Sequence, residues 1–349
     1  MVRWPERSGS PTPAPEPLKG QPSPRVVSRA EDLPERLLRG DRRAVARCIS
    51  HVEDGSPVGR QLLDRIYAHT GKARRIGVTG PPGSGKSTLV HGLARALRAR
   101  GDRVGILAID PSSPFSGGAI LGDRIRMPSA TGDEGLFMRS MASRGSLGGV
   151  AATTYEATEI LEAGGFDWIL IETVGVGQSE LEVVELADTT LLVLVPESGD
   201  SVQAMKAGIM EIADIFVVNK YDREGGDRLI RDLEATLDLT GWTRSGGWRP
   251  WVTQSIAMRE EGIDALLTGI GDHAAWLAED PERQARIRAE KVGRRARVLL
   301  NRTLLEAVWK KVRLEDDLSG AIEPMARREL SPYAWAQSIL EKLAYGREE

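Results

Sequence analysis

Disulfide partners and soft metal ligands are scarce in this chain of 349 residues. There is one cysteine, Cys48, and there are four histidines, His51, His69, His91 and His273. A single cysteine excludes an intramolecular disulfide framework, and histidines scattered in this way form no cluster that would bind a soft metal. No secretory apolar segment is recognisable near the first residue either. We therefore expect a protein of a reducing compartment, the cytoplasm.

Long hydrophobic runs and an excess of one charge are also lacking. No apolar run approaches the roughly 18 residues that a membrane helix needs. The chain has 47 Lys and Arg residues and 50 Asp and Glu residues, so its formal net charge is −3. A basic stretch occurs over residues 283–302, but no aromatic residues are interleaved with it for base stacking. We expect neither a membrane nor a nucleic acid as a partner.

Four segments of different composition follow one another along the chain. Residues 1–28 hold seven of the 19 prolines, which predicts a disordered tail. Residues 29–71 have apolar residues at helical spacing, broken at Gly55-Ser56-Pro57, and predict a helical hairpin. Residues 72–271 alternate strand and helix patterns. Residues 272–349 lose the strand pattern and predict a long helix over 273–313 and a short one over 332–343.

Six runs in the third segment predict strands, at residues 75–80, 103–110, 167–173, 189–195, 214–220 and 250–255. These runs are apolar on both faces, which is typical of parallel strands that helices cover on both sides. The sequence therefore predicts an α/β fold with a doubly wound, mostly parallel sheet.

A phosphate-binding loop follows the first predicted strand. Its sequence, GPPGSGKS, matches the pattern G-x-x-x-x-G-K-[ST] and leads into a helix predicted over residues 88–98. Backbone N–H groups in such a loop converge on phosphate oxygens at a helix N-terminus. Lys86 would contact the β- and γ-phosphates, and the Ser87 hydroxyl would ligate Mg²⁺. The predicted phosphate-binding residues are Gly80, Pro81, Pro82, Gly83, Ser84, Gly85, Lys86, Ser87 and Thr88. This loop alone leaves kinase, ATPase and GTPase activities open.

The motif Asn219-Lys220-Tyr221-Asp222 ends the fifth predicted strand and separates these activities. A carboxylate there can accept hydrogen bonds from the N1–H and the exocyclic amine of guanine, a pair of donors that adenine does not present at that edge. Ligands of α/β folds bind at the carboxyl ends of the strands, where this motif lies. We interpret Asn219, Lys220 and Asp222 as guanine-binding residues and GTP as the nucleotide.

Three acidic positions could complete a Mg²⁺ site. Glu172 ends the strand predicted over 167–173, where a carboxylate would lie near the metal. Asp110 ends the strand over 103–110, and Asp123 follows a glycine-rich stretch. Mg²⁺ keeps several waters and uses few carboxylates. Residue chemistry alone leaves Asp110 open between a metal ligand and a helix cap, and Asp123 between a metal ligand and a surface charge.

The residues after Glu172 bear on the rate of hydrolysis. Gly175 would place a backbone N–H near the γ-phosphate. Val176 stands where Ras-type proteins carry the glutamine that orients water, and Gln178 is a weaker candidate for that task. We therefore expect slow intrinsic hydrolysis that a partner accelerates.

Longer segments of the chain resemble one known family, the MeaB/ArgK family of G-protein chaperones for adenosylcobalamin-dependent acyl-CoA mutases. The similar segments are GPPGSGKS, AIDPSSPFSGGAILGDRIRM, RSMASRGSLGGV, IETVGVGQSE, GDSVQAMKAGIMEIADIFVVNK and SPYAWAQSIL. The resemblance extends from about residue 41 to residue 343. It implies a P-loop GTPase of the SIMIBI-like type that is a homodimer, with the C-terminal helices as the dimerisation arm.

The resemblance also implies roles for individual residues. Ser87, Asp110, Asp123 and Glu172 would surround Mg²⁺, and Ser255, Ile256 and Ala257 are a looser match to the loop that reads guanine. Asp200, Gln203 and Lys206 match a segment called switch III, which relays the nucleotide state to the mutase. Its lysine contributes to partner-stimulated hydrolysis. The predicted catalytic residues are therefore Lys86, Glu172 and Lys206. Without the resemblance, Asp200, Gln203 and Lys206 would be read as an exposed helix face.

The implied partner is an acyl-CoA mutase, and adenosylcobalamin would reach the protein only through it. Methylmalonyl-CoA mutase is the default client, and the isobutyryl-, ethylmalonyl- and 2-hydroxyisobutyryl-CoA mutases are further candidates. Two other classes share the phosphate loop. A nickel-delivery GTPase needs Cys and His clusters, which the sequence lacks. A small-molecule kinase would phosphorylate a metabolite, and the guanine motif argues against it.

Overall fold

The computed structural model describes residues 32–110, 133–142, 149–173, 179–196, 209–241, 243, 247–311 and 314–345. Seven parallel strands form its central sheet in the order β3-β2-β4-β1-β5-β6-β7. They are β1 (Arg74–Thr79), β2 (Val104–Asp110), β3 (Leu136–Ala142), β4 (Trp168–Thr173), β5 (Thr189–Leu194), β6 (Ile215–Asn219) and β7 (Trp251–Ser255). The predicted parallel sheet and its six predicted strands are confirmed.

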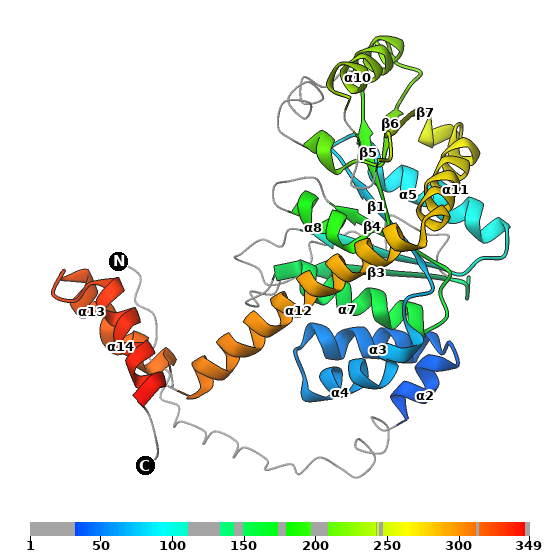
Figure 1. Cartoon of the computed structure of the whole chain (residues 1–349). Helices are drawn as coiled ribbons and strands as arrows, with labels where there is room; N and C mark the ends of the chain where they lie inside the picture. The colour runs from blue at the N-terminus through cyan, green and yellow to red at the C-terminus, as the bar shows by residue number, and fades with distance from the viewer. Residues whose placement is uncertain are drawn as a thin grey trace, which may run out of the picture.

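Helices cover both faces of this sheet (Figure 1). One face carries α5 (Lys86–Ala99) and α11 (Ile263–Glu279), and the other carries α7 (Gly149–Ala163), α8 (Ser179–Leu186) and α10 (Gly226–Thr240). Successive residues of one strand enter different cores, since Leu170 packs with α5 whereas Ile169 and Ile171 pack with α7 and α8. This alternation between two buried faces explains why the strands read as continuous apolar runs. The doubly wound fold is thus confirmed.

The N-terminal helices pack against α7. They are α2 (Leu33–Leu38), α3 (Arg42–Glu53) and α4 (Pro57–Ile66), followed by the short η1 (Tyr67–His69). Asp41 caps α3 by accepting hydrogen bonds from the backbone N–H groups of Arg43 and Ala44. Ser56 caps α4 by accepting one from Gly59. The predicted hairpin is therefore present as α3 and α4, and α2 precedes it. The predicted tail, residues 1–28, lies outside the described residues.

The C-terminal helices extend away from the sheet (Figure 1). The long α12 (Pro281–Lys311) leads to α13 (Leu314–Ala326) and α14 (Pro332–Tyr345). The prediction of one helix over 273–313 is wrong. Helix α11 already begins at Ile263 and ends at Glu279, and α12 is a separate helix that begins after Asp280. The Asp280 carboxylate accepts hydrogen bonds from the backbone N–H groups of Glu282 and Arg283, and so starts a new helix. The expected start of the C-terminal segment, residue 272, falls inside α11.

Two of the longer elements, β3 and α13, were not predicted. β3 is an edge strand whose Arg139 and Ser140 interrupt the apolar pattern, and Arg139 donates hydrogen bonds to Glu53 of α3. α13 contains Pro324, a residue that disfavours a helix interior. Among the described residues, no helix combines the length and the apolar character that would be needed to span a membrane.

Candidate nucleotide site

The predicted phosphate loop connects β1 to α5 at the carboxyl edge of the sheet. Gly80 has φ 140°, and a Cβ atom there would lie 2.2 Å from the carbonyl oxygen of Val193 in β5. Gly85 has φ 90° at the N-terminus of α5, and a Cβ atom there would lie 2.3 Å from Nδ2 of Asn219. Gly83 also has a positive φ, 74°. Glycine is therefore required at these turns by backbone conformation and, at two of them, by close contact.

Lys86 is buried at the start of α5. Its Nζ donates hydrogen bonds to the carbonyl oxygens of Gly80, at 2.8 Å, and Pro81, at 2.9 Å. The side chain is only 5% exposed, so the ammonium group lies inside the turn of the phosphate loop. A cation held there, next to the N-terminus of a helix, produces a strongly positive local field that suits an anion.

Ser87 and Glu172 are brought together by the pairing of β1 with β4. Val78 is the register partner of Glu172, and the Ser87 hydroxyl donates a hydrogen bond to the buried Glu172 carboxylate. Beside them, the Thr173 hydroxyl donates to the Thr79 hydroxyl at 3.1 Å. A hydroxyl and a carboxylate are the hard oxygen ligands that Mg²⁺ prefers, and phosphates and waters supply the others in such sites. The residues present therefore fit Mg²⁺. No group of three or more His, Cys, Asp and Glu side chains that could hold a metal occurs in the described part of the chain.

Asn219, the last residue of β6, connects its own loop to the phosphate loop and to the loop after β7 through side-chain hydrogen bonds. Its Nδ2 donates to the carbonyl oxygen of Ser84 in the phosphate loop at 2.8 Å. Its Oδ1 accepts from the Ser255 hydroxyl and from the Ala257 backbone N–H, each at 3.1 Å. The side chain is 2% exposed, so all these bonds are shielded from water. Ser255 and Ala257, the looser match in the sequence, thus lie beside the stronger motif.

Lys220 and Asp222 stand at the surface of the same site. Lys220 has φ 55°, and its Nζ donates to the carbonyl oxygen of Gly83 at 2.7 Å. The exposed Asp222 lies 3.9 Å from the guanidinium of Arg259, measured between Oδ2 and Nη2. Ile256 lies next to Ala257, between β7 and η4 (Ala257–Arg259). The phosphate loop and the guanine motif therefore form one continuous surface.

The remaining predicted residues are placed only in part. Asp110 is the last residue of β2, next to β4, and only its backbone is described. Six predicted residues lie outside the described part of the chain: Asp123, Gly175, Gln178, Asp200, Gln203 and Lys206. The contacts that were not predicted include those between Thr79 and Thr173 and between Asp222 and Arg259. No motif indicates them, because the partners come from separate elements.

Known proteins resemble this chain over most of its length. The model of the family described as "Methylmalonyl Co-A mutase-associated GTPase MeaB" matches residues 45–313. A protein of Pyrococcus abyssi is 44% identical over 321 residues, which cover 90% of this chain and 97% of that protein. The GTPase ArgK of Escherichia coli is 38% identical over 249 residues, 69% of this chain and 75% of that protein.

A solved structure supports the fold. The crystal structure of a LAO/AO transport system kinase superposes with a TM-score of 0.67 at 26% identity and covers 91% of this chain and 98% of that one. The P-loop GTPase fold predicted from the sequence is thereby confirmed. Because the family match includes the phosphate loop, the guanine motif and the whole of α12, the chain belongs to the MeaB family of methylmalonyl-CoA mutase-associated GTPases.

Proposed function

We propose that this GTPase hydrolyses GTP slowly on its own and faster when it binds an adenosylcobalamin-dependent acyl-CoA mutase. Its turnover would gate cofactor loading and protect the mutase from inactivation. The observation that carries the proposal is the buried Asn219 side chain, which joins the phosphate loop to the Ser255 loop. This bridge would align the phosphate loop with the carboxylate of Asp222, three residues after Asn219, which would read guanine. The family name supports the mutase as the partner.

The phosphates would bind over the loop from Gly80 to Thr88. Lys86 would exchange its hydrogen bonds with the loop carbonyls for bonds with the β- and γ-phosphates, which offer a stronger, charged acceptor. Ser87, Asp110, Asp123 and Glu172 would hold Mg²⁺, an ion that neutralises charge developing on the phosphates. Gly175 would donate its backbone N–H to the γ-phosphate.

The base would bind between the two guanine loops. Asp222 would accept hydrogen bonds from the N1–H and exocyclic amine of guanine. Lys220, whose Nζ donates a hydrogen bond to the carbonyl oxygen of Gly83, would lie along the nucleotide. Ser255, Ile256 and Ala257 would form the other wall, which Asn219 holds in place. The guanine contacts would thus depend on a scaffold that exists before the nucleotide arrives.

Partner recognition would involve Asp200, Gln203 and Lys206. Delivery of the Lys206 ammonium to the γ-phosphate when the mutase binds would stabilise the charge of the transition state, as an arginine finger does. Gln178 would help to position water. The client mutase, methylmalonyl-CoA mutase or a relative, is part of this proposal.

The proposed organisation is a GTPase domain over 72–271 between an N-terminal helical segment, 29–71, and a dimerisation arm, 272–349. The arm exposes large apolar side chains: Leu300 is 57% exposed, Leu304 53% and Leu340 59%. Exposed apolar area of this kind favours burial against another chain. We propose a homodimer that works in the cytoplasm without nucleic acid or membrane.

The test is phosphate release from GTP and from ATP, measured for the full chain alone and with each candidate mutase. We expect slow release from GTP, none from ATP, and stimulation by one mutase of about 10³-fold, the range of a trans-acting cation. Lys86→Ala should abolish hydrolysis, whereas Lys206→Ala should keep the basal rate and lose the stimulation. Equal turnover of ATP and GTP would overturn the guanine assignment. Stimulation by no mutase would overturn the chaperone role.

A further inference from the structure

Two buried hydroxyl groups lie next to the predicted metal position. Thr79 is the last residue of β1 and Thr173 is the last residue of β4, two strands that run side by side in the sheet (Figure 1). Both side chains are 0% exposed, and their hydroxyl oxygens are 3.1 Å apart, with Thr173 as the donor. Thr79 precedes Gly80 of the phosphate loop, and Thr173 follows Glu172. The hydrogen bond therefore joins the two segments that would hold the phosphates and the metal.

The hydroxyl pair of Thr79 and Thr173 extends the connection between β1 and β4. The last register pair of the two strands is Val78 with Glu172. Thr79 and Thr173 are the next residues, and Thr79 is the point at which the chain leaves β1 for the phosphate loop. A side-chain hydrogen bond at this point helps to fix the separation between the start of the loop and the end of β4.

Aliphatic residues flank the hydroxyl pair in the sheet. Leu192 of β5 is the register partner of Thr79, and Ile109 of β2 is the register partner of Thr173. Both aliphatic side chains are fully buried. A valine has nearly the shape of a threonine and would suit such a row, whereas a buried hydroxyl is unfavourable unless it is hydrogen-bonded. Two hydroxyls at the centre of this apolar row indicate a task that an aliphatic pair would not perform.

The hydroxyl pair and the predicted metal ligands lie on opposite faces of β4. The Glu172 carboxylate accepts a hydrogen bond from Ser87, at the start of α5. Successive side chains of a strand point to opposite faces, so Thr173 points to the face that α7 and α8 cover, as Ile171 does. Ser87 follows β1 through the phosphate loop, and Glu172 belongs to β4. A change in the separation of β1 and β4 would therefore move Glu172 relative to Ser87.

We propose that Thr79 and Thr173 are positioning residues for Mg²⁺ in the nucleotide complex. Mg²⁺ demands nearly octahedral coordination with ligand distances of about 2.0 to 2.1 Å, so small displacements of its ligands weaken binding. The hydroxyl pair keeps the phosphate loop, and with it Ser87, at a fixed separation from Glu172. The inference rests on the proposed function, in which Ser87 and Glu172 hold the Mg²⁺ that accompanies GTP. It adds two residues that act through these ligands.

The experiment measures binding of a fluorescent, non-hydrolysable GTP analogue to the full chain, in excess Mg²⁺ and in EDTA. Titration of Mg²⁺ into the complex gives the apparent affinity for the metal. The variants are Thr79→Val, Thr173→Val, the double variant with both changes, and Thr173→Ser. Thermal unfolding of each variant shows whether the fold is retained and how much stability is lost.

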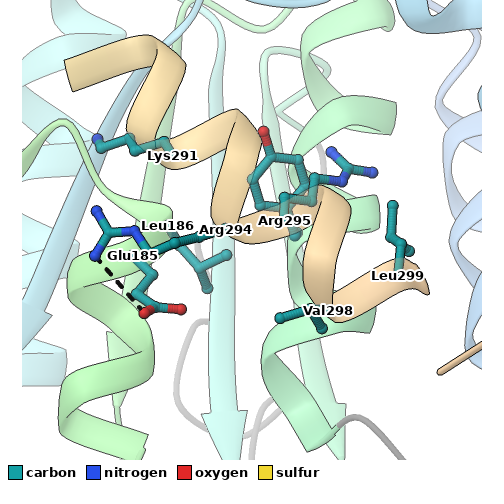
Figure 2. Close-up of a pocket in the computed structure, with 8 residues that line it drawn as sticks. Glu185, Leu186, Lys291, Arg294, Arg295, Val298 and Leu299 are labelled. Carbon is teal, nitrogen blue, oxygen red and sulfur yellow. Dashed lines mark ion pairs between the residues drawn. The ribbon is translucent and has the colours of Figure 1, made fainter. Parts of the chain in front are cut away.

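Two control variants separate the metal site from general stability. Thr189→Val removes another buried hydroxyl of the same sheet at its opposite edge, since Thr189 begins β5, is 2% exposed and has its Oγ1 2.9 Å from Nδ1 of His273. Arg294→Ala removes an exposed ion pair between α12 and Glu185 of α8 (Figure 2). Thr189→Val should lower the unfolding temperature but keep the affinity for Mg²⁺ within about twofold of the wild type. Arg294→Ala should leave both quantities unchanged.

For Thr79→Val and for Thr173→Val we expect the affinity for Mg²⁺ to fall by about 3- to 10-fold, the equivalent of one modest hydrogen bond. Affinity for the nucleotide in EDTA should stay within about twofold of the wild type. Thr173→Ser retains the hydroxyl and should retain the affinity for Mg²⁺. The double variant buries no unpaired hydroxyl, so its unfolding temperature should recover, whereas its affinity for Mg²⁺ should stay low.

Three results would overturn the inference. They are an unchanged affinity for Mg²⁺ in the single variants, a recovery of that affinity in the double variant, and an equal loss of nucleotide affinity in Mg²⁺ and in EDTA. A wild-type chain that binds no guanine nucleotide, or binds it independently of Mg²⁺, would instead overturn the proposed function on which the inference rests.

Discussion

At the scale of single residues, Cys48 lies in the core that joins the N-terminal helices to α7. Burial raises the pKa of its thiol to about 12, because an apolar surrounding disfavours the thiolate. The pKa in the folded chain lies above the ordinary thiol value of 9.0, so the neutral thiol favours folding below pH 9. This contribution of Cys48 to the free energy of unfolding is lost as the pH rises from 9 towards 12.

Cys48 should therefore resist modification in the folded protein. We expect no reaction with a thiol reagent such as 5,5′-dithiobis(2-nitrobenzoate) at pH 8, and one thiol per chain after unfolding in guanidinium chloride, because the thiolate is the reactive form. The measurement is the absorbance of the released thiolate product. Rapid labelling of the folded chain would contradict the burial of Cys48.

Asp222 should determine which base is bound. In Asp222→Asn the side chain keeps one acceptor, for N1–H, and gains an amide donor that suits the 2-carbonyl of xanthine instead of the 2-amine of guanine. We expect GTP affinity to fall by about 100-fold or more and XTP to become the preferred nucleotide. Competition titrations with both nucleotides test this. Asp232→Asn, on the exposed side of α10, is the control and should leave the preference for GTP unchanged.

At the scale of elements, the N-terminus of α5 provides a matched pair of glycines. Gly85 and Gly83 both have positive φ, but only at Gly85 would a Cβ atom collide with Asn219, since nothing lies within 4 Å of a Cβ at Gly83. Gly83→Ala should lower the free energy of unfolding by about 1 kcal/mol, from backbone strain alone. Gly85→Ala should cost about 2 to 4 kcal/mol, from strain and overpacking together.

Urea unfolding of the two variants measures this difference. Gly85→Ala should also weaken nucleotide binding, because displacement of the Asn219 amide releases the Ser255 loop. Equal free energies of unfolding for the two variants would show that α5 and β6 are further apart than described.

At the scale of the whole molecule, the buried carboxylates of α7 depend on other elements for their counter-charges. Glu162 pairs with Arg75 of β1 at 2.8 Å, and Glu156 and Glu159 pair with arginines of α12. The arm is therefore part of the electrostatic balance of the domain.

Removal of one partner of a buried ion pair should lower the free energy of unfolding. Arg295→Ala leaves the buried Glu159 without its ion-pair partner and should lower the free energy of unfolding by about 3 to 5 kcal/mol. The double variant Glu159→Leu with Arg295→Met should recover much of this loss, because no buried charge remains. Arg294→Ala, at an exposed pair, should cost less than about 1 kcal/mol. A small effect of Arg295→Ala, measured by denaturant unfolding, would show that α12 is not docked in solution.

Much of the fold and of the site could be predicted because the signals are local. β1, β4, β5 and β6 are apolar runs buried on both faces, and the phosphate loop is recognisable from its glycines and Lys86. β3 escaped prediction because its Arg139 is paired with Glu53, a partner 86 positions away. The break at Asp280 escaped because helical periodicity continues on both sides of it.

The sequence by itself determined the class of fold and the family, since each motif is a short run whose chemistry depends on neighbouring residues. Only the tertiary structure decided which of these residues meet. Ser87 and Glu172 are 85 positions apart, and Ser84 and Asn219 are 135 apart. Their contacts follow from the order and parallel register of the strands, which depend on packing between distant segments. The hydrogen bond from Lys291 of α12 to the carbonyl oxygen of Ala187 has the same origin, because no local pattern specifies a contact across 104 positions.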